Sequence, residues 1–328
     1  MGSIDMHCDT LMHAYLKTGE NADIYNHPTT SVDFVRLRQG GAMAQFFAIF
    51  MLPQAVYTKF FNREPIPDET YIAGCAAILK QSIAAHSDMV AMATTASQIK
   101  ENNAASKLSA VLSMEDGVAV QGKMENLDRF YKLGVRALSL TWNAANCFGA
   151  PNSKDPEIMA RGLTDFGKEA VKHMQDIGML VDVSHLSDGG FWDVVNIAKK
   201  PFAATHSNCR ALCSHQRNMT DPMIRALADK GGVMGINFGP EFLNADLKDP
   251  HSTVARMVAM AQHEKQIGGI DVIGIGTDFD GIEGDLEIKG PDHMDLLVAG
   301  LNKGGFSDDE IEKIMFKNVL RVMQDAVK

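Results

Sequence analysis

The sequence predicts an α/β protein, a single (β/α)8 barrel of the TIM type with a C-terminal helical extension. Short apolar segments rich in β-branched residues alternate with longer segments of helical periodicity. Eight such apolar segments can be counted. The length of 328 residues also suits one barrel, since such barrels run from about 200 to 400 residues. We therefore expect residues 1–328 to form one domain.

The expected strands and helices follow one another as βα units. The strands are expected at residues 3–7, 42–50, 109–115, 135–142, 179–185, 201–206, 232–238 and 272–278. The helices are expected at residues 70–86 with 94–102, 123–133, 164–177, 191–199, 222–230, 252–267 and 293–302, with a last one that begins at Ser307. Gly134, Gly178 and Gly231 stand at helix ends, where glycine is common. The alternative is a two-domain doubly wound sheet, but no G-x-G-x-x-G motif follows the first strand to support it.

Composition and charge narrow the class of protein. The chain is 45% hydrophobic and 22% charged, which is ordinary for a folded globular protein. Its 41 acidic and 31 basic residues give a net charge of −10, spread evenly, so we expect neither a nucleic acid partner nor an anionic membrane. The five cysteines are scattered and odd in number, which favours reduced thiols. No signal or membrane-spanning segment is evident, and we expect a cytoplasmic protein.

The ends of the expected strands carry residue types that bind metals. In such a barrel the catalytic groups lie at the carboxyl ends of the strands. The first strand ends in His7 and Asp9, which share one face because residues i and i+2 of an extended segment point the same way. The third strand ends in Glu115, just before a turn. Each motif alone is weak evidence, because an ordinary polar strand end looks the same.

Two histidines, His185 and His206, end the fifth and sixth strands. One such histidine is more often a structural residue than a ligand, but two on adjacent strands favour a shared site. The full set of imidazoles and carboxylates, with no cysteine, suits Zn²⁺. Five ligands exceed the need of one ion, and Glu115 is the natural bridge between two. The candidate ligands are His7, Asp9, Glu115, His185 and His206.

The match to one known family runs nearly from end to end. It rests on DMHCD (residues 5–9), GLTDFGK (162–168), GMLVDVSH (178–185), HS (206–207), RN (217–218), KGGV (230–233), GIGTDFDG (274–281) and NVLRV (318–322). On these segments the chain resembles the membrane (renal) dipeptidase family, zinc metallopeptidases with an amidohydrolase-like barrel. The resemblance implies a soluble bacterial-type member, since the secretion and lipid-anchor segments of the membrane-anchored members are lacking.

The resemblance implies a role for each ligand. One zinc ion is expected to bind His7, Asp9 and Glu115, and the other Glu115, His185 and His206. A water or hydroxide is expected to bridge the two ions beside Glu115, and to attack the peptide bond of a dipeptide. Glu115 therefore counts among the catalytic residues as well as among the ligands.

Two further residues take their expected roles from the resemblance. Asp278 is similar to the family's proton shuttle, and Arg217 to the arginine that binds the substrate's C-terminal carboxylate. A guanidinium suits that task because it binds a carboxylate through two parallel hydrogen bonds. The resemblance also implies a small dipeptide substrate, tolerance of a D-residue at its C-terminal position, and a homodimer.

Two positions depart from the family pattern. Membrane-anchored members end the fourth strand with Leu-Thr-His, and that histidine helps to polarise the scissile carbonyl, whereas this chain has Trp142. We expect Trp142 and Asn143 to bind the substrate, with Asn146 as a further candidate, although a buried aromatic role suits Trp142 equally well. Asp116 stands where the family has glycine after the bridging glutamate, and the sequence predicts no consequence of this change.

Two alternatives to a dipeptidase stay open at this point. The first is another binuclear amidohydrolase, such as a lactonase or deaminase; many of these bridge their metals with a carboxylated lysine on the fourth strand, where Thr141 and Trp142 offer none. The second is a metal-binding homologue with impaired catalysis, because a fold does not determine its function. The presence of all five ligands and of Asp278 argues against the second alternative.

Overall fold

A computed structural model describes residues 1–328, apart from the side chains at positions 55 and 60. Its main sheet is parallel and has nine strands: β1 (Ser3–Asp5), β2 (Ala42–Phe50), β3 (Val90–Met92), β4 (Leu108–Glu115), β5 (Val135–Ser139), β6 (Leu180–Asp182), β7 (Ala203–Ala204), β8 (Val233–Ile236) and β10 (Ile273–Ile275). The strand order is β2-β1-β10-β8-β7-β6-β5-β4-β3, and the sheet closes because β2 also pairs with β4. This closure confirms the predicted barrel.

The ninth strand, β3, was not predicted. It pairs with β4 from Leu108 to Ala110, and β5 pairs with β4 from Leu112 onward. Since β2 occupies the other edge of β4, β3 extends the edge that β5 uses and lies outside the ring of eight. A strand of three residues is too short to show a sequence period of its own.

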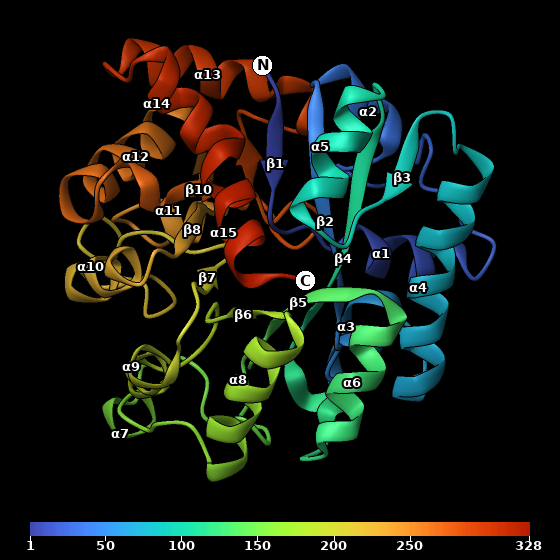
Figure 1. The fold of residues 1–328 in the computed structure, drawn as a ribbon, viewed down its shortest axis with the longest axis horizontal. Helices are drawn as coiled ribbons and strands as arrows, with labels where there is room; N and C mark the ends of the chain where they lie inside the picture. The colour runs from blue at the N-terminus through green and yellow to red at the C-terminus, as the bar shows by residue number, and fades with distance from the viewer.

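Helices surround the strands (Figure 1). The predicted helices are present within a few residues of their expected bounds, because amphipathic periodicity and caps such as Thr164 define them in the sequence. They are α4 (Asp68–Ala85), α5 (Ala96–Ala104), α6 (Met124–Leu133), α8 (Asp165–Ile177), α9 (Asp188–Ile197), α10 (Asp221–Asp229), α12 (Val254–Gly268), α13 (Met294–Lys303) and, in the C-terminal extension, α14 (Asp308–Glu312), the π-helical turn Lys313–Lys317 and α15 (Asn318–Ala326).

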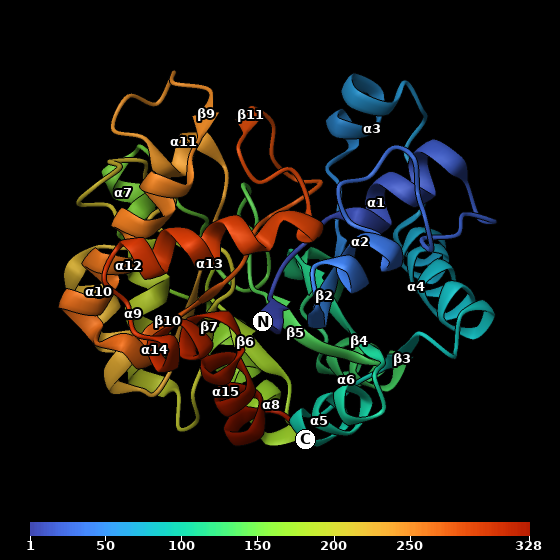
Figure 2. The same cartoon turned by 90° about the horizontal axis from the view of Figure 1, so that it is seen from above.

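Several short elements escaped prediction because they span only a turn or two. They are α1 (Thr10–His13) with the π-helical turn Ala14–Thr18, α2 (Phe34–Gln39), α3 (Gln54–Phe61), α7 (Pro156–Met159), α11 (Pro240–Leu243), the 3-10 turns Gly117–Val120, Ile270–Val272 and Pro291–His293, and the paired strands β9 (His251–Ser252) and β11 (Asp285–Leu286). Most of these follow the carboxyl ends of strands. Figure 2 shows α3, α7, α11, β9 and β11 at the end of the molecule away from the C-terminus.

The C-terminal extension covers the opposite end of the barrel. Val319 and Met323 of α15 belong to one buried cluster with Met43, Leu180 and Val233, which lie at or beside the starts of their strands. In Figure 1 this helix lies in front of the strands. The extension therefore closes the end where the strands begin and leaves the other end to the loops. Among the described residues no helix is both long and apolar enough to cross a membrane.

Several strands are shorter than predicted at their carboxyl ends, although β2 and β4 end at the predicted residues. The predicted strands reach His7, His185 and Asp278, whereas β1, β6 and β10 end at Asp5, Asp182 and Ile275. Trp142 and His206 likewise lie beyond the ends of β5 and β7. His185 and Asp278 have positive φ angles of 66° and 64°, which no strand contains. These expected strand ends are therefore wrong, and the candidate ligands beyond them lie on turns.

Two buried aspartates organise these turns. Asp5 Oδ1 accepts hydrogen bonds from the backbone N–H groups of His7 (3.2 Å) and Thr277 (2.9 Å), and Asp5 Oδ2 accepts one from Thr277 Oγ1 (2.7 Å). Asp182 Oδ1 accepts from the N–H groups of Ser184 and Thr205, both at 2.9 Å, and its Oδ2 accepts from Thr205 Oγ1 at 2.5 Å. We call Asp5–Thr277 and Asp182–Thr205 the two aspartate–threonine clasps.

Replacing Asp182 by alanine is expected to destabilise the protein strongly. The change leaves two buried N–H groups without their carboxylate acceptor, at a cost of about 1–3 kcal/mol for each orphaned donor. Asp182→Asn is the matched control, because its amide oxygen can still accept from both. Chemical denaturation should give a loss in unfolding free energy of about 2–5 kcal/mol for Asp182→Ala and a smaller loss for Asp182→Asn. Equal losses would contradict the clasp.

Candidate metal centre and substrate pocket

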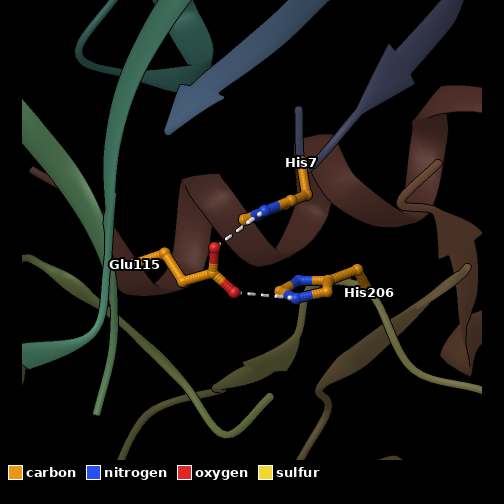
Figure 3. Close-up of side chains that lie close together, drawn as sticks. All are labelled: His7, Glu115 and His206. Atoms are coloured by element: carbon orange, nitrogen blue, oxygen red, sulfur yellow. Dashed lines mark ion pairs between the residues drawn. The ribbon is translucent and has the colours of Figure 1, made fainter. Parts of the chain in front are cut away.

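The predicted ligands meet at the carboxyl end of the barrel. His7 follows β1, Glu115 is the last residue of β4, and His206 follows β7. Figure 3 shows the two imidazoles facing the Glu115 carboxylate from different elements. One ligand atom from each of the three residues lies within 4.8 Å of the others, and the same is true of His7, Asp9 and Asp278.

The Glu115 carboxylate lies at the centre of this cluster. Its Oε2 atom is 3.5 Å from His7 Nε2. Its Oε1 atom is 3.0 Å from His185 Nε2 and 3.3 Å from His206 Nε2. Oε2 therefore faces one histidine and Oε1 faces two others. This is the arrangement that a bridging carboxylate requires.

Asp9 and Asp278 lie on the His7 side of the cluster. His7 Nε2 is 3.6 Å from Asp9 Oδ2 and 3.8 Å from Asp278 Oδ1. His7 Nε2 and Asp9 Oδ1 are buried and have no hydrogen-bond partner among the described residues. Buried polar atoms are rarely left unpaired, and a cation would satisfy both. The donor set of imidazole and carboxylate, with no thiolate, fits zinc or a related divalent ion.

Burial and neighbouring charges shift the pKa values of these groups. Burial, together with the Glu115 charge, raises the pKa of Asp9 to about 6. Burial also raises the pKa of Asp278 to about 8, with Asp9 and Glu115 adding to the effect. Burial alone would lower the pKa of His7, but the facing carboxylates of Glu115 and Asp9 hold it well above its usual value. The metal-free cluster thus retains protons that a cation would displace.

Hydrogen bonds to neighbouring residues orient the functional side chains. Thr205 Oγ1 lies 2.8 Å from His206 Nδ1, on the ring edge away from Glu115. Asn237 Nδ2 donates to Asp278 Oδ2 at 2.8 Å. Asp278 and His206 each directly follow the threonine of a clasp, so the clasps fix both. Sequence reasoning missed Asp5, Asp182, Thr205, Thr277 and Asn237; the one available signal was a threonine before a candidate residue at two strand ends.

Arg217 is buried beside the metal cluster, with 6% of its surface exposed. Its Nη1 atom donates to Ser207 Oγ at 2.6 Å and its Nη2 atom to the His206 carbonyl at 2.8 Å. No carboxylate of the described residues lies within ion-pair distance of it, and its buried Nε has no partner. Burial lowers the pKa of Arg217 to about 10, so the guanidinium stays charged at neutral pH.

A cavity of about 400 Å³ opens beside Arg217. Most of its lining is polar, and it includes Asn143, Lys154, His185, His215, Arg217 and Glu241. This volume falls within the range of small-ligand pockets. The cavity therefore joins one side of the metal cluster, through His185, to an unpaired buried cation.

The two residues predicted to bind the substrate, Trp142 and Asn143, lie next to His185. The Trp142 ring centroid is 4.9 Å from that of Phe50 and 6.2 Å from that of His185, and Trp142 is not among the residues that line the cavity. Asn143 does line the cavity, and its Oδ1 atom is 3.3 Å from His185 Nδ1. Asn146 points elsewhere, since its Nδ2 atom donates to Asp116 Oδ1 at 2.7 Å.

The chain matches one protein family along its whole length. The model of the family described as membrane dipeptidase, peptidase family M19, matches residues 1–328. A Klebsiella pneumoniae protein named for the pqqA 5′ region is 35% identical over 257 residues, which cover 76% of this chain and 94% of that protein. Dipeptidase verJ from Clonostachys rogersoniana is 30% identical over 316 residues, covering 94% of this chain and 79% of that protein.

A solved structure of a metallopeptidase is similar to this chain along its whole length. A metallopeptidase from Rhodobacter sphaeroides, crystallised with a phosphinate mimic of the dipeptide L-Ala-D-Ala, superposes with a TM-score of 0.87. The two chains are 25% identical, and the match covers 99% of each. The sequence resemblance is thereby confirmed: the chain belongs to the membrane dipeptidase family, peptidase family M19.

Proposed function

We propose that this metallo-dipeptidase is a binuclear zinc enzyme that hydrolyses dipeptides with a free C-terminal carboxylate. The observation that carries the proposal is the Glu115 carboxylate, whose two oxygens face His7 on one side and His185 with His206 on the other. In the proposal His7, Asp9 and Glu115 hold one ion, and Glu115, His185 and His206 hold the other. When bound, the two cations supply a hydroxide nucleophile at neutral pH and polarise the scissile carbonyl.

In this proposal Asp278 moves the proton. Its carboxylate takes the proton of the attacking water as the new C–O bond forms, and delivers it to the amine nitrogen as the C–N bond breaks. Two contacts support the role: Oδ1 lies on the His7 side of the cluster, and Oδ2 is held by Asn237. The positive φ of Asp278 turns the residue off the strand.

Arg217 binds the C-terminal carboxylate of the substrate in this proposal. It is charged, buried and free of an ion pair with any described residue, and it lines a cavity that also reaches His185. A dipeptide fits a cavity of about 400 Å³, whereas a longer chain would place no free carboxylate at this distance from the metals. The likeness to a metallopeptidase that binds an L-Ala-D-Ala mimic supports acceptance of a D-residue. The homodimer and the cytoplasmic location stay predictions.

The decisive measurement is metal content combined with amino acid release from a panel of L,L and L,D dipeptides. With two equivalents of zinc we expect hydrolysis of members of the panel. Asp278→Asn should lower kcat about 100- to 10,000-fold and keep both zinc ions, because it removes only the proton transfer. The control is Asp295→Asn, an exposed residue of α13, which should behave as wild type. A zinc-loaded wild type that cleaves no dipeptide would overturn the proposed function.

Arg217→Ala should raise KM for dipeptides about 10- to 150-fold and leave zinc content unchanged, because it removes a charged hydrogen-bonding partner worth about 1.5–3 kcal/mol. The matched control is chemical: the same dipeptides with an amidated C-terminus. Wild type and variant should cleave the amides equally slowly. If the substitution raised KM as much for the amides as for the free dipeptides, Arg217 would not bind the substrate's carboxylate.

Zinc affinity of the metal-free protein should fall as the pH drops from 8 to 6. His7 and Asp278 both have raised pKa values, about 8 for Asp278, so both retain protons near pH 7 that bound zinc displaces. Because the metal-free form binds more protons, acid favours that form. Titration calorimetry in buffers of different ionisation enthalpy should show about two protons released, and one fewer in Asp278→Asn. Affinity that does not change over this range would contradict these assignments.

A further inference from the structure

Asp116 directly follows the central Glu115 and has a φ angle of 68°. This backbone region favours glycine, which is the residue that the family pattern places here. An aspartate at such a φ is strained unless its side chain gains compensating contacts. Asp116 Oδ1 accepts two hydrogen bonds, from the Val118 N–H at 3.0 Å and from Asn146 Nδ2 at 2.7 Å. The second bond reaches a different loop.

Asn146 uses every atom of its amide to hold this loop, residues 140–149. Besides its bond to Asp116, Nδ2 donates to the Leu140 carbonyl at 2.8 Å. Its Oδ1 atom accepts from the Phe148 N–H, also at 2.8 Å. Asn146 therefore ties both ends of loop 140–149 to each other and to the turn after Glu115. The two segments also touch at Gly117, where an added Cβ would lie 2.3 Å from the Phe148 ring.

Two residues of loop 140–149 contact the His185 ring. Asn143 Oδ1 lies 3.3 Å from His185 Nδ1, and the Trp142 ring packs between Phe50 and His185. An amide oxygen can only accept, so this contact requires a proton on Nδ1 and leaves the Nε2 lone pair directed at Glu115. Such partners fix the ring orientation and tautomer of a ligand histidine.

We propose that Asp116 and Asn146 form a positioning pair for the His185 side of the metal centre. Their hydrogen bond holds loop 140–149 against the Glu115 turn, and the loop in turn orients the His185 ring through Asn143. The pair thus links the turn after Glu115 to His185, one of the two histidines that face the Glu115 Oε1 atom. This inference rests on the proposed function for its metal, although its test does not require catalysis.

A local role is the competing explanation, in which Asp116 merely caps the 3-10 turn Gly117–Val120 through the Val118 N–H. Asp116→Gly separates the two, because glycine relieves the positive φ and removes the bond to Asn146. Under the proposal this variant folds as well as wild type. It binds its second zinc, the ion on the His185 side, about 10- to 100-fold more weakly, with a comparable fall in kcat. Under the local explanation, restoring glycine leaves zinc affinity and kcat unchanged.

The experiment measures two successive zinc dissociation constants by competition with a chelating dye, and thermal unfolding of each variant. Asn146→Ala should match Asp116→Gly, and the double variant should lose no more than either single one. Asp116→Asn should keep both zinc dissociation constants at their wild-type values, since the Oδ1 atom of asparagine can accept the same two hydrogen bonds. Asn126→Ala is the matched control. It removes the hydrogen bond from Asn126 Nδ2 to the Val120 carbonyl, which lies in the same turn but does not involve loop 140–149.

The outcomes are distinct. Wild-type second-zinc affinity in both Asp116→Gly and Asn146→Ala, or additive losses in the double variant, would overturn the positioning pair. If Asp116→Gly fails to fold, Asn146→Ala decides alone. If wild type binds two zinc ions but cleaves no dipeptide, the proposed function fails, and the zinc affinities still judge the pair.

Discussion

The geometry of the site depends on where backbone N–H groups find acceptors beyond the ends of the strands. The N–H groups of Met6 and Val183 still donate to the neighbouring strands, but those of His7 and Ser184 lie beyond the ladder and need another acceptor. The two buried carboxylates supply it and also reach across to a threonine on the neighbouring strand. One arrangement, used twice, lets the chain leave the sheet at a fixed angle. The turns can then carry side chains that regular strands would direct elsewhere.

The barrel, its long helices and the candidate ligands could be predicted from the sequence, for physical reasons. Amphipathic periods and caps define the long helices. His7, Glu115 and His206 could be predicted only as a set, because together they bring imidazoles and a carboxylate to the same end of the barrel. The clasps could not be predicted. In the sequence Asp182 looks like an ordinary polar strand end. Only the structure shows that it accepts a hydrogen bond from Thr205, 23 residues further along the chain. β3 and the short helices were not predicted because each spans too few periods for a hydrophobic pattern to be recognised.

The two departures from the family pattern are connected in the structure. Asp116 contacts Asn146, and Asn146 shapes the loop that places Trp142 beside His185. A change at one position therefore alters the surroundings of the other, and neither can be judged as an isolated substitution. Trp142 stands where the membrane-anchored members have a histidine, and it does not line the cavity, so polarisation of the scissile carbonyl would fall to another residue or to bound metal.

The clasp between Asp5 and Thr277 joins residues 272 positions apart. While the ribosome makes the chain, His7 and Asp9 emerge early, but β1 has neither β10 beside it nor its clasp partner until residue 277 has appeared. Contacts this distant in sequence form late, and they slow folding. A nascent fragment that ends before residue 277 already contains all five candidate ligands but lacks the clasp that holds the turn of His7. The turn that carries His7 therefore gains its clasp only after nearly the whole barrel has been synthesised.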